Sequence, residues 1–244
     1  MPRPSTRLAM TGEEQLQARM QEDLAEYLQP AHFVDSDNPA VIAFARRVAG
    51  SAHADADIAV RLFYAIRDGI RYDPYTVSLD PANYRASAVV KQSRAFCVPK
   101  AILLAACARA LGVPARLGFA DVRNHLSSGK LSSRLKTDLF VFHAYSELYI
   151  GGKWVKATPA FNIELCRRFG VRPLEFDGRT DALFHPYDAE GRRHMEYVRD
   201  RGTYADLPFE TMLSAFGEAY GTELPASEEH DEAFHGGGPS EPTK

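Results

Sequence analysis

The first third of the chain alternates between helical patterns and polar breaks. Residues 12–28 carry apolar side chains four positions apart, which predicts a helix with one apolar stripe. An Asp-Asn-Pro signal at 37–39 precedes a second, shorter helix over 41–48. Apolar positions recur at intervals of three and four over 55–69 and predict a third helix. The Asp- and Pro-rich segment 70–84 then predicts a loop with short extended pieces.

The segment 99–111 differs from these helices because it is apolar almost all round, which predicts a buried helix. Pro99 stands in the first turn, where proline is tolerated, and Gly112 followed by Pro114 is a stop signal. The pattern therefore places Cys97 at the N-terminus of a buried helix.

Strand patterns dominate the second half of the chain. Strands are predicted over 115–122, 139–150 and 153–157, with a polar surface loop at 123–137 and a Gly-Gly hairpin turn at 151–152. Residues 167–184 give a mixed pattern, a further hairpin is predicted around 184–198, and 209–220 predict a last helix. Helices followed by one buried helix and then antiparallel strands predict an α+β fold.

We expect three segments along the chain. Residues 1–54 form an N-terminal helical segment, and residues 55–221 form the main domain. Residues 222–244 are acidic and rich in Gly, Pro and Ser, which predicts a disordered tail.

Composition narrows the class of protein. The 244 residues are 45% hydrophobic and 25% charged, with a net charge of −3, so neither a nucleic-acid nor a membrane-surface partner is expected. The sequence has neither an apolar run of about 20 residues nor an apolar signal core at its start. Three widely spaced cysteines do not predict a disulfide framework, so we expect a cytoplasmic protein. The sequence leaves the oligomeric state open.

Two residues could supply thiol chemistry. A helix N-terminus favours a thiolate, so the position of Cys97 predicts a lowered pKa, and its backbone N–H is a candidate oxyanion donor. His143 shares one face of its predicted strand with Val141 and Tyr145, and it becomes the base if that strand lies against the helix. The histidines lack the spacing of metal ligands, so no metal site is predicted.

Five short stretches resemble the bacterial transglutaminase-like superfamily. They are FCVPKAILL at 96–104, RALGVPAR at 109–116, HAYSE at 143–147, GGKW at 151–154 and TP at 158–159. The resemblance covers about residues 56–162 and implies a papain-like arrangement, with a Cys-bearing helix packed on an antiparallel sheet. It implies a Cys97 nucleophile and a His143 base acting on a peptide or protein amide. This chemistry requires no cofactor.

The sequence departs from the family pattern at three positions. Phe96 stands where the family has Gly, and Tyr145 stands where Trp is common; both are predicted to line the substrate groove. Thr158 stands where the family has the Asp that orients the histidine. Either the Thr158 hydroxyl or the Asn162 amide could take that role, since neutral third members function in papain-like proteases.

Further questions stay open at this point. The second oxyanion donor of the family lies upstream of the cysteine, where Asn83 or Tyr84 could supply it. The reaction could be amide hydrolysis, cross-linking or another acyl transfer, and hydrolysis is favoured because no feature for a second substrate is visible. The alternative is a catalytically inactive domain that acts as a binding module, which Thr158 would favour.

Overall fold

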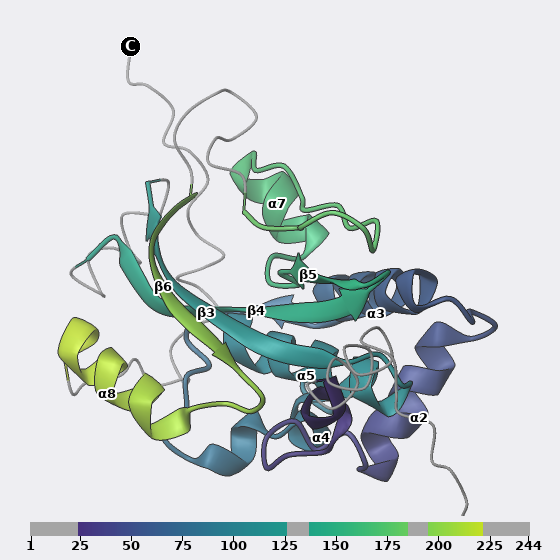
Figure 1. Ribbon diagram of the computed structural model, residues 1–244. Helices are drawn as coiled ribbons and strands as arrows, with labels where there is room; N and C mark the ends of the chain where they lie inside the picture. The colour runs from purple at the N-terminus through teal and green to yellow at the C-terminus, as the bar shows by residue number, and fades with distance from the viewer. Residues whose placement is uncertain (1–23, 126–136, 185–194, 222–244) are drawn as a thin grey trace, which may run out of the picture.

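The computed structural model describes residues 24–125, 137–184 and 195–221. A group of helices packs beneath one antiparallel sheet (Figure 1). The longer helices of this group are α2 (Pro39–Ala49), α3 (Asp55–Gly69) and α5 (Cys97–Ala110). They follow the segments predicted from apolar spacing, and α3 matches its predicted bounds. Asn38 caps α2 by accepting the Ala40 N–H at 3.0 Å, which explains the start signal.

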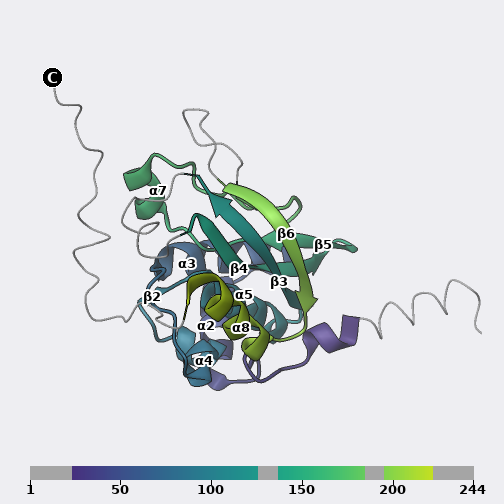
Figure 2. The ribbon, with the colours of Figure 1, turned by 90° about the vertical axis from the view of Figure 1, so that its left-hand side faces the viewer.

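The sheet has four strands in the order β5-β4-β3-β6, all antiparallel (Figure 2). These strands are β3 (Ala115–Asn124), β4 (Leu139–Ile150), β5 (Lys153–Ala157) and β6 (Met195–Tyr204). Glycines 151 and 152, both at positive φ, make the predicted turn between β4 and β5. The predicted α+β class is therefore confirmed.

Helix α5 is the centre of the core. Every residue from Cys97 to Arg109 is buried, which explains why the sequence shows no polar stripe there. Ser146 on β4 donates its hydroxyl hydrogen to the Ala101 carbonyl at 2.8 Å and ties the sheet to this helix. Helix α5 thus holds its first residue, Cys97, against the sheet.

Shorter elements complete the structure. They are η1 (Glu26–Leu28), β1 (Arg71–Tyr72), η2 (Pro81–Tyr84), α4 (Ala86–Val89), β2 (Arg94–Ala95), α7 (Ile163–Phe169) and α8 (Phe209–Tyr220). Strands β1 and β2 pair in parallel, and α8 has its predicted bounds. Among the described helices, none is both long and apolar enough to cross a bilayer.

The structure differs from the sequence predictions in the less regular segments. Residues 167–184 were predicted to be mixed, but their first residues belong to helix α7, which starts at Ile163. Strand β6 lies partly in the predicted 184–198 hairpin, but it pairs with β3. The turn of that hairpin lies outside the described residues, as do most of the 12–28 helix, the centre of the 123–137 loop and the 222–244 tail. Helices α2 and α3 share one hydrophobic core, so the boundary at residue 54 stays a prediction.

Candidate active site

Cys97 is the first residue of α5. The N-cap residue before it, Phe96, makes no capping hydrogen bond with its side chain. Phe96 occupies the N-cap in an extended conformation, and its carbonyl accepts the Lys100 N–H at 3.4 Å. The backbone N–H groups of Ala144, Val98 and Cys97 itself act on the Cys97 sulfur and lower its pKa. Because Ala144 follows His143, β4 passes the thiol at the position of the histidine.

A β-bulge precedes His143 on β4. Ala120 pairs with His143 and Val122 with Phe140, so two residues of β4 lie opposite Asp121 alone. Phe142, one of those two, has a φ of 54°, a left-handed conformation that is uncommon for a bulky residue. Bulges of this kind redirect side chains beside functional sites.

One carboxylate holds this bulge together. Asp121 is buried and accepts the Phe142 N–H at 3.1 Å. The same carboxylate oxygen accepts a hydrogen bond from Arg201 of β6, and the guanidinium lies 4.7 Å from the centre of the Phe142 ring. The strained residue before His143 is therefore fixed by a hydrogen bond and by its contact with Arg201.

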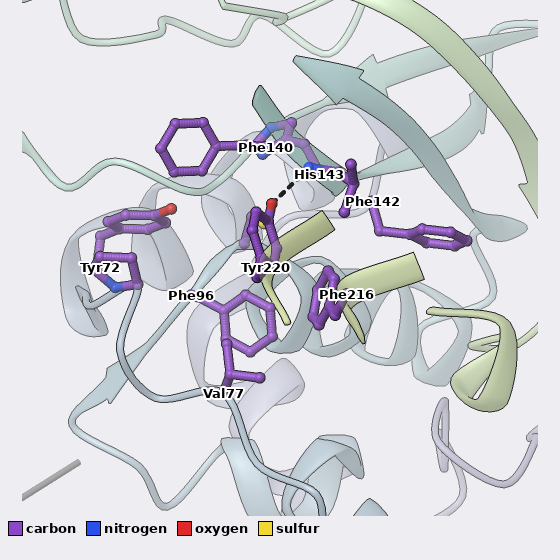
Figure 3. A pocket seen from close by; sticks show the side chains of 11 residues that line it. Tyr72, Val77, Phe96, Phe140, Phe142, His143, Phe216 and Tyr220 are labelled. Carbon is purple, nitrogen blue, oxygen red and sulfur yellow. Dashed lines mark hydrogen bonds between the residues drawn. The ribbon is translucent and has the colours of Figure 1, made fainter. Parts of the chain in front are cut away.

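Cys97 and His143 line the same pocket, which has a volume of about 60 Å³ (Figure 3). Its walls come from β1 and the segment after it, the start of α5, the bulged part of β4, and α8. The lining residues are Tyr72, Pro74, Val77, Phe96, Cys97, Phe140, Val141, Phe142, His143, Phe216 and Tyr220. The structure thus brings the two predicted reactive residues together from separate elements.

Burial sets the protonation states of both residues. It raises the pKa of Cys97 to about 11, outweighing the opposing N–H groups and the more distant charge of Lys100. Burial also lowers the pKa of His143 to about 3. The lowered thiol pKa predicted from the helix N-terminus is therefore wrong, because loss of solvent outweighs the helix dipole. At pH 7 the site holds a neutral thiol and a neutral imidazole.

The imidazole of His143 is enclosed by aromatic rings. The Phe184 ring lies 4.9 Å away and the Tyr197 ring 6.5 Å away, between centroids. Among the described residues, the buried Nε2 of His143 and the buried Oγ1 of Thr158 lack hydrogen-bond partners. The Tyr197 hydroxyl interacts with Thr158 strongly enough to affect the tyrosine pKa, but does not form a hydrogen bond of normal geometry. Unpaired buried polar atoms are rare in folded proteins and often mark functional sites.

The two candidate third residues differ in their hydrogen bonds. Thr158 follows β5 and its backbone N–H donates to Ala182, while its hydroxyl forms no hydrogen bond of normal geometry with a described residue. Asn162 is engaged at both ends: Oδ1 accepts the Tyr72 N–H at 3.0 Å, and Nδ2 donates to Glu164 at 2.7 Å. The Asn162 amide therefore supports the backbone of a pocket residue rather than the histidine.

Of the four residues predicted for the oxyanion site or groove, Phe96 alone lines the pocket. Tyr145 lies elsewhere, over Gly118, where a Cβ would come within 2.2 Å of its ring. Asn83 is exposed and donates to Ser78, and the Tyr84 hydroxyl is bonded to the Ser78 backbone. Tyr145 and Asn83 therefore do not lie at the pocket as predicted, whereas Tyr84 packs on Phe96 near Cys97 but does not line the pocket.

Eight of the eleven lining residues were not predicted as site residues from the sequence, among them Tyr72, Phe216 and Tyr220. Tyr72 lines the pocket together with Cys97, and burial and then the charge of a Cys97 thiolate raise its pKa. Phe216 and Tyr220 come from α8, and the Tyr220 hydroxyl accepts the Val141 N–H at 2.7 Å (Figure 3). The Tyr72 hydroxyl could have been suspected from its place upstream of the cysteine, whereas α8 carries no local signal of its role.

Lys100, one turn after Cys97, is a second buried ionisable group. Its Nζ donates to the carbonyls of Arg67, Ile70 and Ala160 at 2.9, 2.6 and 2.7 Å. Burial lowers the pKa of Lys100 to about 7, but three carbonyl acceptors match the three donors that only the ammonium form has. Lys100 therefore ties α5 to the end of α3 and to the chain after β5. In the part of the chain that the structure describes, no three His, Cys, Asp or Glu side chains gather as metal ligands would.

Comparisons with known proteins found one matching family model and several partly similar structures. Residues 42–159 match the model of the transglutaminase-like superfamily. A structure from Cytophaga hutchinsonii, provisionally described as a cysteine protease, is 17% identical with a TM-score of 0.44, covering 82% of this chain and 57% of that one. A structure from Parabacteroides distasonis, provisionally described as a protease, is 14% identical (TM-score 0.36; 56% of this chain, 25% of that one). A structure described as a TGase is 18% identical with a TM-score of 0.33, and the match covers 63% of this chain and 34% of that one.

The chain therefore spans just over half of the first of these proteins and less of the others. At these TM-scores the three structures say nothing about its reaction. No curated protein matches the sequence at a significant level. The matched segment contains Cys97, His143 and Thr158 within the order of elements described above. Residues 42–159, just under half of the chain, therefore form a segment of the transglutaminase-like superfamily.

Proposed function

We propose that this protein is a cysteine hydrolase or acyltransferase that attacks an amide carbonyl, with Cys97 as nucleophile and His143 as general base and acid. The observation that carries the proposal is the shared pocket: a thiol at a helix N-terminus and an imidazole redirected by a bulge meet in one cavity. Family membership supports the general type of chemistry.

The neutral state of both groups shapes the mechanism. Because neither residue is charged at pH 7, the proton passes from Cys97 Sγ to His143 as the sulfur attacks the carbonyl carbon. The imidazolium then donates that proton to the leaving amine, the C–N bond breaks, and a thioester remains on Cys97. In hydrolysis, water gives a proton to His143, attacks the thioester and releases the acid, and the proton returns to the sulfur.

The oxyanion of the tetrahedral intermediate needs donors beside the sulfur. The backbone N–H of Cys97 is one, because it lies in the first turn, where no intrahelical acceptor exists. The Tyr72 hydroxyl is the second in our proposal, in place of Asn83 or Tyr84. Its position in the pocket with Cys97 and the hydrogen bond from its backbone to Asn162 support this role.

Thr158 is the third member in our proposal. When His143 is protonated, Nε2 carries a hydrogen that needs an acceptor, and the enclosed Thr158 Oγ1 is unpaired. A hydroxyl carries no charge, so it stabilises the imidazolium less than the family Asp would. Because the imidazolium is less stabilised, we expect a lower catalytic rate than that of family members with the Asp.

A specific observation also favours the second candidate function, an inactive binding module. The thiol pKa of about 11 and the uncharged Thr158 both weaken the reactive pair. Such a domain would keep the pocket as a ligand site without turning over an amide.

The rate of Cys97 alkylation by iodoacetamide, measured against pH by peptide mass spectrometry, separates the two functions. If His143 acts as base, the wild type reacts at pH 7 about 100-fold faster than His143→Ala. Thr158→Asp should react faster still, because a carboxylate stabilises the imidazolium. The buried thiols Cys107 and Cys166 are internal controls in every sample. Equal rates in wild type and His143→Ala would exclude the catalytic pair and leave the binding module.

A further inference from the structure

The pocket beside Cys97 is built almost entirely from apolar and aromatic side chains. No lining residue among those described is Asp, Glu, Lys or Arg. Val77, Phe96 and Phe216 form parts of its wall from three different segments (Figure 3). A charged group entering this space would lose its hydration without gaining a partner of opposite charge.

The polar atoms of the pocket are few. The Tyr220 hydroxyl accepts the Val141 N–H, so it can offer an occupant its single hydrogen. The Cys97 thiol, the His143 ring and the Tyr72 hydroxyl take part in the proposed reaction. A carboxamide side chain of the glutamine type would therefore enter with several donors and acceptors unsatisfied.

The size of the pocket narrows its occupant further. Its volume is about 60 Å³. An engineered protein cavity that holds benzene measures about 150 Å³. The space beside Cys97 is therefore smaller than a cavity that encloses an aromatic ring, and its size suits a short branched aliphatic chain.

We propose that this pocket binds a branched aliphatic side chain, of the size of leucine or valine, on the acyl part of the substrate next to the carbonyl that Cys97 attacks. The inference rests on the proposed function and names its substrate class. The amide that is cleaved thus follows an aliphatic residue or acyl group, and acidic or carboxamide side chains are poor occupants of the same position.

A panel of acetyl-amino-acid chloromethyl ketones tests this, because the amino-acid side chain of such a reagent lies on the acyl side. Cys97 Sγ forms a bond to the methylene carbon, chloride leaves with the electron pair of the C–Cl bond, and the thiol proton passes to His143. The inactivation rate should be about 30-fold higher for the leucine than for the glycine reagent. Reagents of glutamine, aspartate and phenylalanine should each react more slowly than that of leucine.

Two variants of α8 sharpen the test. Phe216→Ala removes one wall, so the ratio of the inactivation rates with the leucine and glycine reagents should fall at least threefold. The rate with the phenylalanine reagent should rise relative to that with the leucine reagent. Phe209→Ala is the matched control, because Phe209 is buried on the same helix but packs on Phe33 and Tyr84 instead of the pocket. Its ratios should match those of the wild type. An equal fall in both variants would overturn the assignment of the wall.

Other outcomes separate this inference from the proposed function. If iodoacetamide labels Cys97 in a His143-dependent way but the panel shows no preference for leucine, the substrate class is wrong and the catalytic pair stands. If the glutamine or aspartate reagent is fastest, the pocket takes polar chains and the inference falls. If no reagent reacts with Cys97, the proposed function falls and this inference falls with it.

Discussion

Lys100 and His143 are both buried ionisable residues near Cys97, but their hydrogen bonding differs. Lys100 on α5 has three carbonyl partners for its ammonium group. His143 on β4 has an enclosed Nε2 with no partner among the described residues. A satisfied buried group holds elements together, whereas an unsatisfied one keeps its hydrogen-bonding capacity for another state.

Within one small region, Lys100 therefore has a structural role, whereas His143 has the proposed catalytic role. Lys100 fixes the first turns of α5 against α3 and the chain after β5, so the position of Cys97 does not depend on the reactive pair. In the proposed mechanism, the Thr158 hydroxyl accepts a hydrogen bond from Nε2 of His143 once the imidazole is protonated. The following predictions test that contrast.

The largest effect is expected for Lys100→Met. Methionine has a similar length but no donor, so three buried carbonyls lose their partner. The free energy of unfolding should fall by about 3–5 kcal/mol, measured by urea denaturation. Lys91→Met, at an exposed position, is the control and should change it by less than about 0.5 kcal/mol. A small effect at Lys100 would mean that the carbonyls are satisfied in another way.

A second effect should follow the protonation of His143. Its pKa is about 3 in the folded protein against a usual 6.5, so between those values the unfolded chain binds more protons. Stability should therefore fall as pH is lowered through this window, by about 2 kcal/mol between pH 6.5 and pH 5. Denaturation curves of wild type and His143→Phe at several pH values measure this.

The phenylalanine variant should lack this part of the acid sensitivity, because it cannot take up the proton. His125→Phe serves as a comparison, since His125 lies at the surface beside Glu196. Parallel pH profiles for wild type and His143→Phe would show that the folded protein accommodates the imidazolium.

The smallest effect is expected for Thr158→Val. Valine keeps the shape and removes a hydroxyl that lacks a partner, so the free energy of unfolding should stay within about 1 kcal/mol and shift toward greater stability. Ser146→Ala is the matched control, because its hydroxyl donates to Ala101 and its loss should cost about 1 kcal/mol. A larger loss at Thr158 than at Ser146 would show that the threonine hydroxyl is already bonded in the resting protein.

The regular elements could be predicted because their signals are local. Apolar residues at three and four positions define α3 and α8, and the Gly-Gly turn defines the β4–β5 hairpin. The cysteine and histidine motifs also placed both candidate catalytic residues on the correct element types. Each of these inferences depended on neighbours within about one turn or one strand.

Other features depend on contacts between distant segments. The bulge at Phe142 depends on Asp121 and on Arg201 in β6, which the β4 sequence alone does not reveal. The pKa of Cys97 depends on the depth of burial, which reversed the prediction from helix position. Tyr220 reaches the pocket by contact with Val141, about 80 residues earlier in the chain. Local pattern therefore predicted the elements but not the electrostatics of the site.

The far wall of the pocket has a consequence for biosynthesis. Phe216 and Tyr220 on α8 are made about 120 residues after Cys97, at a translation rate of about 5–20 residues per second. For several seconds the nascent chain therefore contains the reactive motifs without the helix that completes their cavity. If Cys97 acts as proposed, its pocket is complete only after α8 has left the ribosome.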